Sequence, residues 1–294
     1  MGRSLPGAAL FFWGNTMKLP KPRYTVESDN HKYTIKLDTG ETVGPLISVT
    51  KVLEIIAKPA LINWSARESA NYFKTEILRL GRSAIDPAML EQIAKDAAGA
   101  HRRKAKDAAD LGTKCHDIFQ AIIEGREPTD VPTELAQPAN DFKKWRMQSD
   151  IELVAFELPV ASAELRFGGR IDAIGHSPAR GGFGIVDYKT SKSLLYGNEY
   201  SYQVGGYAEA IEEQYGIDIA WAEIVRFGKV APYESEARPV KDIAAAIEGF
   251  KRAVALVRSG EVTLIGEPSF ECVSKPEEPE AKPKKKKAAS DMGF

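Results

Sequence analysis

Cysteine is scarce in this sequence, since only Cys115 and Cys272 occur among 294 residues. Two cysteines cannot form a disulfide framework, and they exclude a zinc or iron–sulfur site that needs four cysteines from one chain. Such scarcity is typical of proteins that fold in a reducing compartment. We therefore expect a cytoplasmic protein whose stability comes from a hydrophobic core.

Long apolar runs are also absent. No stretch of eighteen apolar residues occurs, so the sequence predicts no membrane span. The apolar segment at residues 8–13 is too short for the core of a signal peptide, and we interpret residues 1–20 as a loose N-terminal arm. Met17 is an alternative start. The GxxxxGK[ST] motif is missing too, which argues against a P-loop helicase.

Excess charge of either sign is missing, because 40 basic and 41 acidic residues give a net charge of −1. This balance argues against a polycation that coats nucleic acid, but it permits local basic patches. Basic residues cluster at 102–106 and 143–146, and a lysine-rich run lies at 282–287. Each cluster is either a solvated surface or a source of phosphate affinity, and the sequence does not decide between them.

The hydrophobic content of 43% is enough for a sizeable core. Periodicity predicts helices before residue 150 and mainly strands after it. The expected helices cover residues 61–80, 89–125 with a break near Gly99, 141–148, 200–215 and 240–258, with a loop at Pro128, Pro132 and Pro138. The expected strands lie within 21–50 and at 151–160, 166–174, 184–190, 219–227 and 230–238. We divide the chain into an N-terminal arm with a small β region (1–44), a main α/β domain (45–267) and a disordered tail rich in Pro, Glu and Lys (268–294).

Acidic residues occur on three successive predicted strands. Asp187 and Lys189 are two apart in the string GIVDYKT, so their side chains share one face of the strand. Alone, this pair is compatible with an ordinary surface ion pair. Asp172 on the preceding strand and Glu157 on the strand before it also lie among apolar residues, where a lone carboxylate is costly. A shared divalent cation offers them a partner, and hard oxygen ligands suit Mg²⁺ or Mn²⁺.

Three further polar residues lie on predicted helices. His116 precedes the strands, and its imidazole can complete a metal shell, although a lone histidine is more often structural. Gln203 and Tyr207 are four residues apart on the helix after the third strand and share one helical face. Here too the alternative is structural, with Tyr207 in the core and Gln203 facing solvent.

The order of these residues resembles the RecB-type branch of the PD-(D/E)XK nuclease superfamily, and in particular its phage and prophage exonucleases. The strings GTKCH, FGGRIDAIG, IVDYKTSK and YQVGGYAEA carry the resemblance, together with the segment from Ile47 to Trp64. It extends over about residues 45–265. The resemblance implies an α/β fold, a restriction-endonuclease-like core of order αβββαβ, here with helical N-terminal decoration.

The resemblance also implies a role for each residue. His116, Asp172, Asp187 and the backbone carbonyl of Tyr188 would be metal ligands. Lys189 would orient the attacking water and stabilise charge on the phosphate, and Glu157 would support the metal shell. Gln203 would hold the site by hydrogen bonds, and Tyr207 would pack behind it or touch the DNA backbone. The implied cofactor is Mg²⁺, with Mn²⁺ as a substitute and without an iron–sulfur cluster.

The sequence thus predicts a metal-dependent deoxyribonuclease, most of all an exonuclease of phage-type recombination, replication or repair. Its substrate would be DNA, in the cytoplasm of a bacterial or phage-infected cell, and a single-strand annealing or recombination protein is a candidate partner. Two alternatives remain open: a non-catalytic DNA-binding protein on the same fold, and a structure-specific endonuclease.

Overall fold

The computed structural model describes residues 17–29, 31–81, 85–190, 198–229 and 234–260. The first half contains strands β1 (Thr25–Asp29), β2 (Lys32–Lys36) and β3 (Thr42–Ser48), the short helices α1 (Val49–Val52) and η1 (Leu53–Ile55), and helices α2 (Pro59–Leu80), α3 (Pro87–Ala98), α4 (Ala100–Ile123) and α5 (Thr133–Gln148). The second half contains β4 (Glu152–Ser162), β5 (Phe167–Ser177), η3 (Pro178–Arg180), β6 (Gly182–Lys189), α6 (Glu199–Tyr215), β7 (Trp221–Arg226), β8 (Glu236–Pro239) and α7 (Ile243–Ser259). The run α5-β4-β5-β6-α6-β7 confirms the predicted αβββαβ order.

The strands form one sheet in the order β1-β2-β3-β5-β6-β7-β8, and β4 pairs with β5 beside this path. β4, β5 and β6 form an antiparallel meander, whereas β6 and β7 run parallel with α6 as their crossover. β3 joins β5 only through Ile47 and Ser48, which pair with Phe167 and Gly168. The N-terminal strands therefore extend the central sheet.

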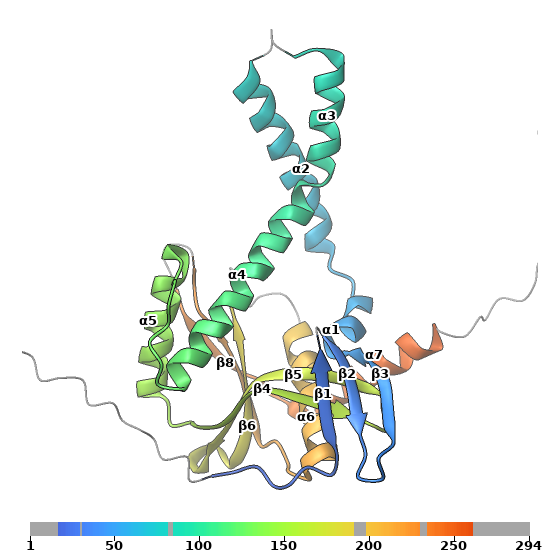
Figure 1. Cartoon of the computed structure of the whole chain (residues 1–294), viewed down its shortest axis with the longest axis vertical. Coiled ribbons are helices and arrows are strands. Elements are labelled where there is room, and N and C mark those ends of the chain that lie inside the picture. The colour runs from blue at the N-terminus through green and yellow to red at the C-terminus, as the bar shows by residue number, and fades with distance from the viewer. Residues whose placement is uncertain (1–16, 30, 82–84, 191–197, 230–233, 261–294) are drawn as a thin grey trace, which may run out of the picture.

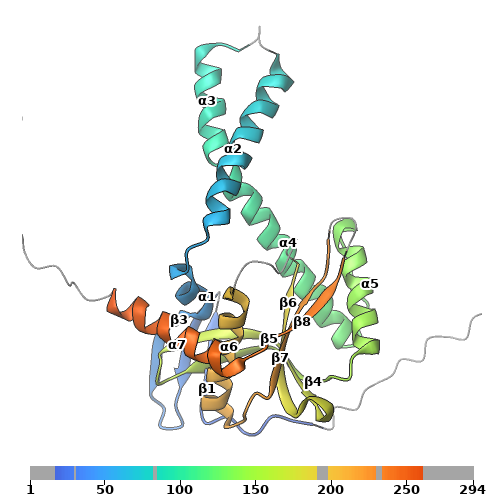
Figure 2. The same cartoon turned by 180° about the vertical axis from the view of Figure 1, so that it is seen from behind.

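Helices cover both faces of the sheet (Figures 1 and 2). On one face α6, α7 and α1 pack on a core that includes Ile171, Ile185 and Phe250. On the other face α4 and α5 pack on an aromatic core, in which the rings of Phe119 and Phe142 stack with centroids 4.1 Å apart. Two buried faces explain why the central strands β4, β5, β6 and β7 have few exposed positions.

Helices α2, α3 and the first half of α4 project from the sheet as an arm (Figure 1). None of the residues of α2 is buried, and Leu61, Ile62 and Leu78 are exposed large hydrophobic side chains on it. Within the described residues, no helix is both long enough and apolar enough to cross a membrane. The second half of α4 returns to the sheet and carries His116 with it.

The sequence placed most elements correctly, but two of its boundaries are wrong. Pro138 was expected in a loop and instead lies inside α5, which begins at Thr133. Leu135, Pro138, Ala139 and Phe142 are all buried at helical spacing, so packing of this face overrides the lost backbone hydrogen bond. The meander strands also extend further than expected, so η3 and Gly181 supply most of the connection expected at 176–183.

Several expectations lie outside the described residues, namely the N-terminal arm before residue 17, Cys272, the tail 268–294 with its lysines, and the first part of the strand expected at 230–238. The later part of that strand is present as β8. The division into 1–44, 45–267 and 268–294 remains a prediction.

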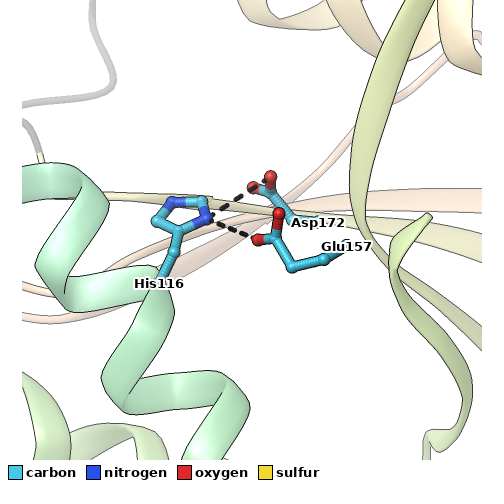
Figure 3. A group of neighbouring side chains, drawn as sticks. All are labelled: His116, Glu157 and Asp172. Atoms are coloured by element: carbon cyan, nitrogen blue, oxygen red, sulfur yellow. Dashed lines mark hydrogen bonds and ion pairs between the residues drawn. The ribbon is translucent and has the colours of Figure 1, made fainter. Parts of the chain in front are cut away.

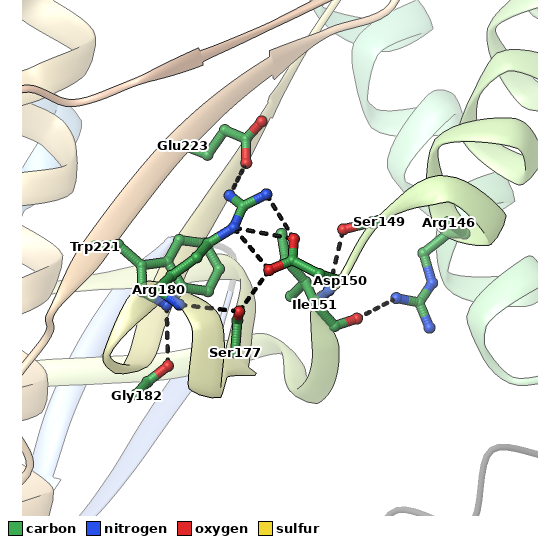
Figure 4. A network of polar contacts seen from close by, with 9 residues as sticks. All are labelled: Arg146, Ser149, Asp150, Ile151, Ser177, Arg180, Gly182, Trp221 and Glu223. Atoms are coloured by element: carbon green, nitrogen blue, oxygen red, sulfur yellow. Dashed lines mark hydrogen bonds and ion pairs between the residues drawn. The ribbon is translucent and has the colours of Figure 1, made fainter.

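The turn between β5 and β6 is fastened by Arg180, as Figure 4 shows. Its guanidinium lies 2.7 Å from Asp150 and 2.5 Å from Glu223, and 5.0 Å from the ring centroid of Trp221. Ser177 Oγ donates to the same Asp150 carboxylate at 2.6 Å. This network connects the N-terminal ends of β4, β6 and β7. It therefore stabilises the meander at the end of β6 that is opposite to Asp187 and Lys189.

Candidate metal centre

β5 and β6 separate at the position of Asp172. Their antiparallel pairing runs from Ser177–Gly182 to Ala173–Val186 and stops there. Beyond this point the Asp172 carboxylate accepts a hydrogen bond of 2.7 Å from the backbone N–H of Tyr188. A side chain thus replaces the missing strand partner, and this places a carboxylate in the fork between two strands.

The side-chain alternation of β5 is interrupted at the same position. Ile171 packs in the core beneath α6 and α7, whereas Ala173, two residues later, packs in the core beneath α4 and α5. In a regular strand these two side chains would share a face. In β4, the residue that the register places opposite Asp172 is Glu157, which has a φ of 47°. A non-glycine residue in this region is strained, and such strain is concentrated at functional sites.

His116 turns its Nδ1 toward both of these acids, whose carboxylates lie side by side (Figure 3). Its Nδ1 is 3.1 Å from Glu157 Oε1 and 3.6 Å from Asp172 Oδ1. Burial alone would lower the pKa of His116, but the carboxylates of Asp172 and Glu157 outweigh it and raise the pKa to about 9. Burial together with the charge of Asp187 raises the pKa of Asp172 to about 6, although His116 acts in the opposite direction. The three side chains therefore form one electrostatically coupled cluster.

Asp187 and Lys189 form the second half of the site, on the same face of β6 as predicted. Lys189 Nζ lies 2.6 Å from Asp187 Oδ2 and donates to Gln203 Oε1 at 3.2 Å. Gln203 Nε2 in turn donates to the hydroxyl of Tyr207 at 3.0 Å. Burial lowers the pKa of Lys189, but the charges of Asp187 and Asp172 raise it by more than burial lowers it, so the pKa lies above the usual value. Lys189 is accordingly a protonated, positioned ammonium group.

Glycines allow α6 to approach the sheet and α7 closely. A Cβ at Gly169 would come within 2.6 Å of the Tyr207 ring, so this glycine makes room for Tyr207 behind the site. A Cβ at Gly205 would lie 2.3 Å from the backbone of Ala246 in α7. These contacts explain why the strings FGGRID and YQVGGYA contain glycine pairs. Tyr207 is 4% exposed and packs in the core beneath α6 and α7, with its hydroxyl accepting from Gln203, so it does not face solvent.

The side chain of Tyr188 lies on the opposite face of β6 from Asp187 and Lys189, on the side of α4, where its ring centroid is 6.4 Å from that of His116. It is buried in the aromatic core of the α4 and α5 face, where it contacts Phe119 and Phe142 edge to face. Its backbone N–H lies in the fork, where it donates to Asp172. A pocket adjoins the His116 cluster, and it is lined by His116, Glu157, Asp172 and Tyr188 together with the apolar Phe119, Ile123 and Phe156.

The residues present fit a divalent cation. One ligand atom each from His116, Glu157 and Asp172 lie within 4.8 Å of one another. Asp187 stands outside that group, but its Oδ1 is buried and has no hydrogen-bond partner in the described part of the chain. An orphaned buried carboxylate oxygen is costly unless a cation balances it. An imidazole with several carboxylates is a donor set suited to Mn²⁺ or Mg²⁺.

Two residues near the site were not predicted from the sequence. Arg170 Nη1 lies 3.8 Å from Glu157 Oε2, and the Tyr200 ring centroid lies 5.1 Å from Lys189 Nζ. Arg170 precedes Asp172 by two residues on the same strand, and this spacing was a signal available in the sequence. Tyr200 offers no comparable signal, because its contact depends on how α6 returns to the sheet.

Comparison with known proteins identifies the family. A family model described as the PD-(D/E)XK nuclease superfamily matches residues 88–274, more than half of the 294 residues. The chain belongs to the PD-(D/E)XK nuclease superfamily. The fork, with its acids and Lys189, lies within the matched segment of this nuclease, whereas β1, β2, β3, α1 and α2 precede it.

Two solved structures are also similar to this nuclease. An alkaline exonuclease from Laribacter hongkongensis has 11% identity over 51% of this chain and 78% of its own, with a TM-score of 0.32. A crystal structure of SSO0001 has 16% identity over 72% of this chain and 76% of its own, with a TM-score of 0.30. No curated protein matches the chain. The assignment to the superfamily rests on the family match.

Proposed function

We propose that this nuclease is a Mg²⁺-dependent exonuclease that hydrolyses phosphodiester bonds in DNA. The observation that carries the proposal is the fork between β5 and β6, which brings Asp172 beside His116 and Glu157 on one side and sets Asp187 with Lys189 on the other. Acids that the sequence spreads over 31 positions, from Glu157 to Asp187, are thereby gathered at one place.

His116, Asp172 and Asp187 would hold the cation, with the carbonyl of Tyr188, and Glu157 is close enough to His116 to serve beside them. When bound, a divalent cation supplies Lewis acidity toward the phosphate and lowers the pKa of water. Glu157 and Asp172 also line the pocket at the cluster, where their carboxylates can accept hydrogen bonds from a water molecule.

Lys189 acts as an electrostatic clamp in this proposal. Its pKa is raised by Asp187 and Asp172, so the ammonium keeps its proton at neutral pH and is a poor general base. A fixed positive charge close to the scissile phosphate stabilises the charge that develops on its oxygens. Gln203 and Tyr207 position the ammonium through the chain of hydrogen bonds described above.

The choice of exonuclease and of DNA rests on the resemblance of the strings GTKCH, FGGRIDAIG, IVDYKTSK and YQVGGYAEA to phage and prophage exonucleases. The same resemblance supports a role in phage-type recombination, replication or repair, in the cytoplasm, beside a single-strand annealing or recombination partner. Both the non-catalytic and the endonuclease alternatives make different predictions in one experiment.

That experiment is the digestion of end-labelled linear DNA and of circular single-stranded and plasmid DNA, with Mg²⁺, with Mn²⁺ and with EDTA. We expect metal-dependent release of nucleotides from linear DNA and no cleavage of circles. Cleavage of circles would indicate an endonuclease. Binding of DNA without cleavage of any substrate would indicate the non-catalytic alternative.

Variants connect the activity to the site. Asp187→Asn and Lys189→Met are expected to lose about 10² to 10³ in rate, as for other residues that stabilise a transition state electrostatically. Lys251→Met is the matched control, because Lys251 is a half-exposed lysine paired with Glu209 between α7 and α6. Full activity in Asp187→Asn or Lys189→Met would overturn the site assignment.

A further inference from the structure

Arg170 stands at the exposed rim of the metal cluster. Its side chain is 47% exposed, and its Nη1 lies 3.8 Å from Glu157 Oε2. Glu157 in turn contacts His116 through its other oxygen at 3.1 Å. The guanidinium therefore contacts the candidate ligands only through the Glu157 carboxylate, and it is exposed to solvent.

The face of β5 that carries Arg170 is set by its neighbours. A Cβ at Gly169 would meet Tyr207 and Val49, and Ile171 packs beneath α6 and α7. Residues 169 and 171 thus face α6, so Arg170 between them faces the opposite side, where α4 brings His116 to the sheet. An arginine on that side looks toward the same space as the cluster.

A positive charge at Arg170 favours the binding of a phosphodiester, because the rest of the site is acidic. Glu157, Asp172 and Asp187 repel a phosphodiester, and the charge of Lys189 is already engaged with Asp187. Among the residues that the structure describes, Arg170 makes one hydrogen bond, from Nη2 to Ser28 Oγ at 2.8 Å, besides its long ion pair with Glu157. A guanidinium carries five N–H donors, so most of its donors are available for phosphate oxygens.

Ser28 comes from β1, which precedes the segment that matches the superfamily. Its hydroxyl accepts from Arg170 across 142 positions of sequence. Tyr33 on β2 packs against Gly168, where a Cβ would lie 2.6 Å from Tyr33 Cβ, and this contact holds the N-terminal strands beside the start of β5. The N-terminal strands thereby help to fix the guanidinium in place.

We propose that Arg170 binds a phosphate of the substrate strand next to the scissile one, and that Ser28 is its positioning residue. Each DNA strand carries one phosphate per about 3.4 Å of helix axis, so the phosphates that flank the scissile one pass within reach of a cation at the rim of the cluster. The inference rests on the proposed function, because it assigns a substrate contact to the same site.

The test uses Arg170→Ala and Arg170→Lys in the full chain. Arg252→Ala is the matched control, since Arg252 is an exposed arginine paired with Glu248 on α7. For Arg170→Ala we expect KM for DNA to rise about tenfold with kcat within about threefold of wild type. Arg170→Lys keeps the charge but loses the bidentate fork, so it should recover only part of the affinity.

Two measurements distinguish substrate binding from a structural role. DNA affinity is measured at several salt concentrations in an Asp187→Asn background. The slope of the logarithm of the binding constant against the logarithm of salt concentration should become shallower by roughly one phosphate contact for Arg170→Ala. It should not change for Arg252→Ala. Mn²⁺ affinity without DNA should be unchanged. Weaker Mn²⁺ binding together with a lower kcat would overturn the proposal, because Arg170 would then act through Glu157. Identical salt slopes and KM values for Arg170→Ala and Arg252→Ala would overturn it as well.

Ser28→Ala gives an independent test of positioning. The serine does not touch the proposed phosphate, so we expect about a threefold rise in KM and no change in the salt slope. A Ser28→Ala enzyme identical to wild type would remove the positioning role. If the wild-type protein binds DNA but cleaves none, the proposed function fails, while the salt slopes still decide whether Arg170 binds phosphate.

Discussion

The carboxylate of Asp172 accepts a hydrogen bond of 2.7 Å from the backbone N–H of Tyr188, at the point where β5 and β6 part. One aspartate thus has two duties. It holds the edge of β6 in place after the strand pairing has ended, and it presents its charge to His116. A substitution that keeps the hydrogen bond from Tyr188 but removes the negative charge beside His116 therefore separates the structural role of Asp172 from its chemical role.

The pair Asp172→Asn and Asp172→Ala makes that separation. The asparagine keeps an oxygen that accepts from Tyr188, whereas alanine leaves a buried N–H unpaired, which costs about 1–3 kcal/mol. We expect both variants to lose activity, with Asp172→Ala the less stable by that amount. Urea unfolding in EDTA at pH 7 measures the difference, and equal stability would show that the hydrogen bond contributes nothing.

Gln203 is expected to act through Lys189. Gln203→Ala removes the acceptor that holds the ammonium, so kcat should fall about tenfold while KM changes little. Gln203→Glu keeps the acceptor for Lys189, and its second oxygen can accept from the Tyr207 hydroxyl with the donor direction reversed, so it should restore much of kcat. Steady-state kinetics on end-labelled DNA measures both values, and a change confined to KM would contradict a positioning role.

Tyr188→Phe is expected to leave activity intact. The hydroxyl of Tyr188 is buried without a hydrogen-bond partner in the described part of the chain, and the polar group that this residue contributes to the site is its backbone N–H. Removing an unpaired buried hydroxyl should stabilise the fold by roughly 1 kcal/mol. Tyr207→Phe is the matched control, because its hydroxyl is paired with Gln203 and its loss should lower both stability and kcat.

Metal binding should compete with the proton of His116. The pKa of His116 is raised to about 9 in the metal-free protein, so the imidazole is charged at pH 7 and must lose its proton to become a ligand. Mn²⁺ affinity should therefore rise about tenfold per pH unit between pH 7 and 8.5. Calorimetry in buffers of different ionisation enthalpy should detect about one proton released at pH 7. Affinity independent of pH in that interval would exclude His116 as a ligand.

The stability of the metal-free protein should change with pH in the opposite direction to its metal affinity. A raised histidine pKa means that protonated His116 stabilises the folded state below its unfolded pKa near 6.5, and that this contribution disappears as pH rises through about 9. In EDTA the free energy of unfolding should therefore fall between pH 7 and 9. His116→Gln should flatten this dependence.

Cys115 reports on the opening of the core. It is fully buried, and burial raises the pKa of its thiol to about 12. In a Cys272→Ser variant, alkylation at pH 8 should therefore be slow in native buffer and fast in denaturant. A rate that matches the unfolded protein in native buffer would show that α4 detaches from the sheet readily.

Sequence periodicity alone determined most elements and the faces of single strands. Asp187 and Lys189 share a face because side chains alternate along a strand, and the helix ending at Tyr215 closes with Gly216 in the left-handed region. Both properties depend on residues that are close in the chain. The acids and His116 were also named from the sequence, since their types and order resemble those of the RecB-type branch, and all of them lie within the segment that matches the superfamily.

Only the tertiary structure decided how these residues meet. The left-handed backbone of Glu157, the interrupted alternation at Asp172 and the contact of Arg170 with Ser28 arise where strands part or join, far from each other in sequence. Pro138 shows the same effect in the core, where burial of one helical face overrides a local breaker. Local preferences amount to about 1 kcal/mol for most residues and about 3 kcal/mol for proline inside a helix, and the burial of several apolar side chains between distant segments exceeds them in sum.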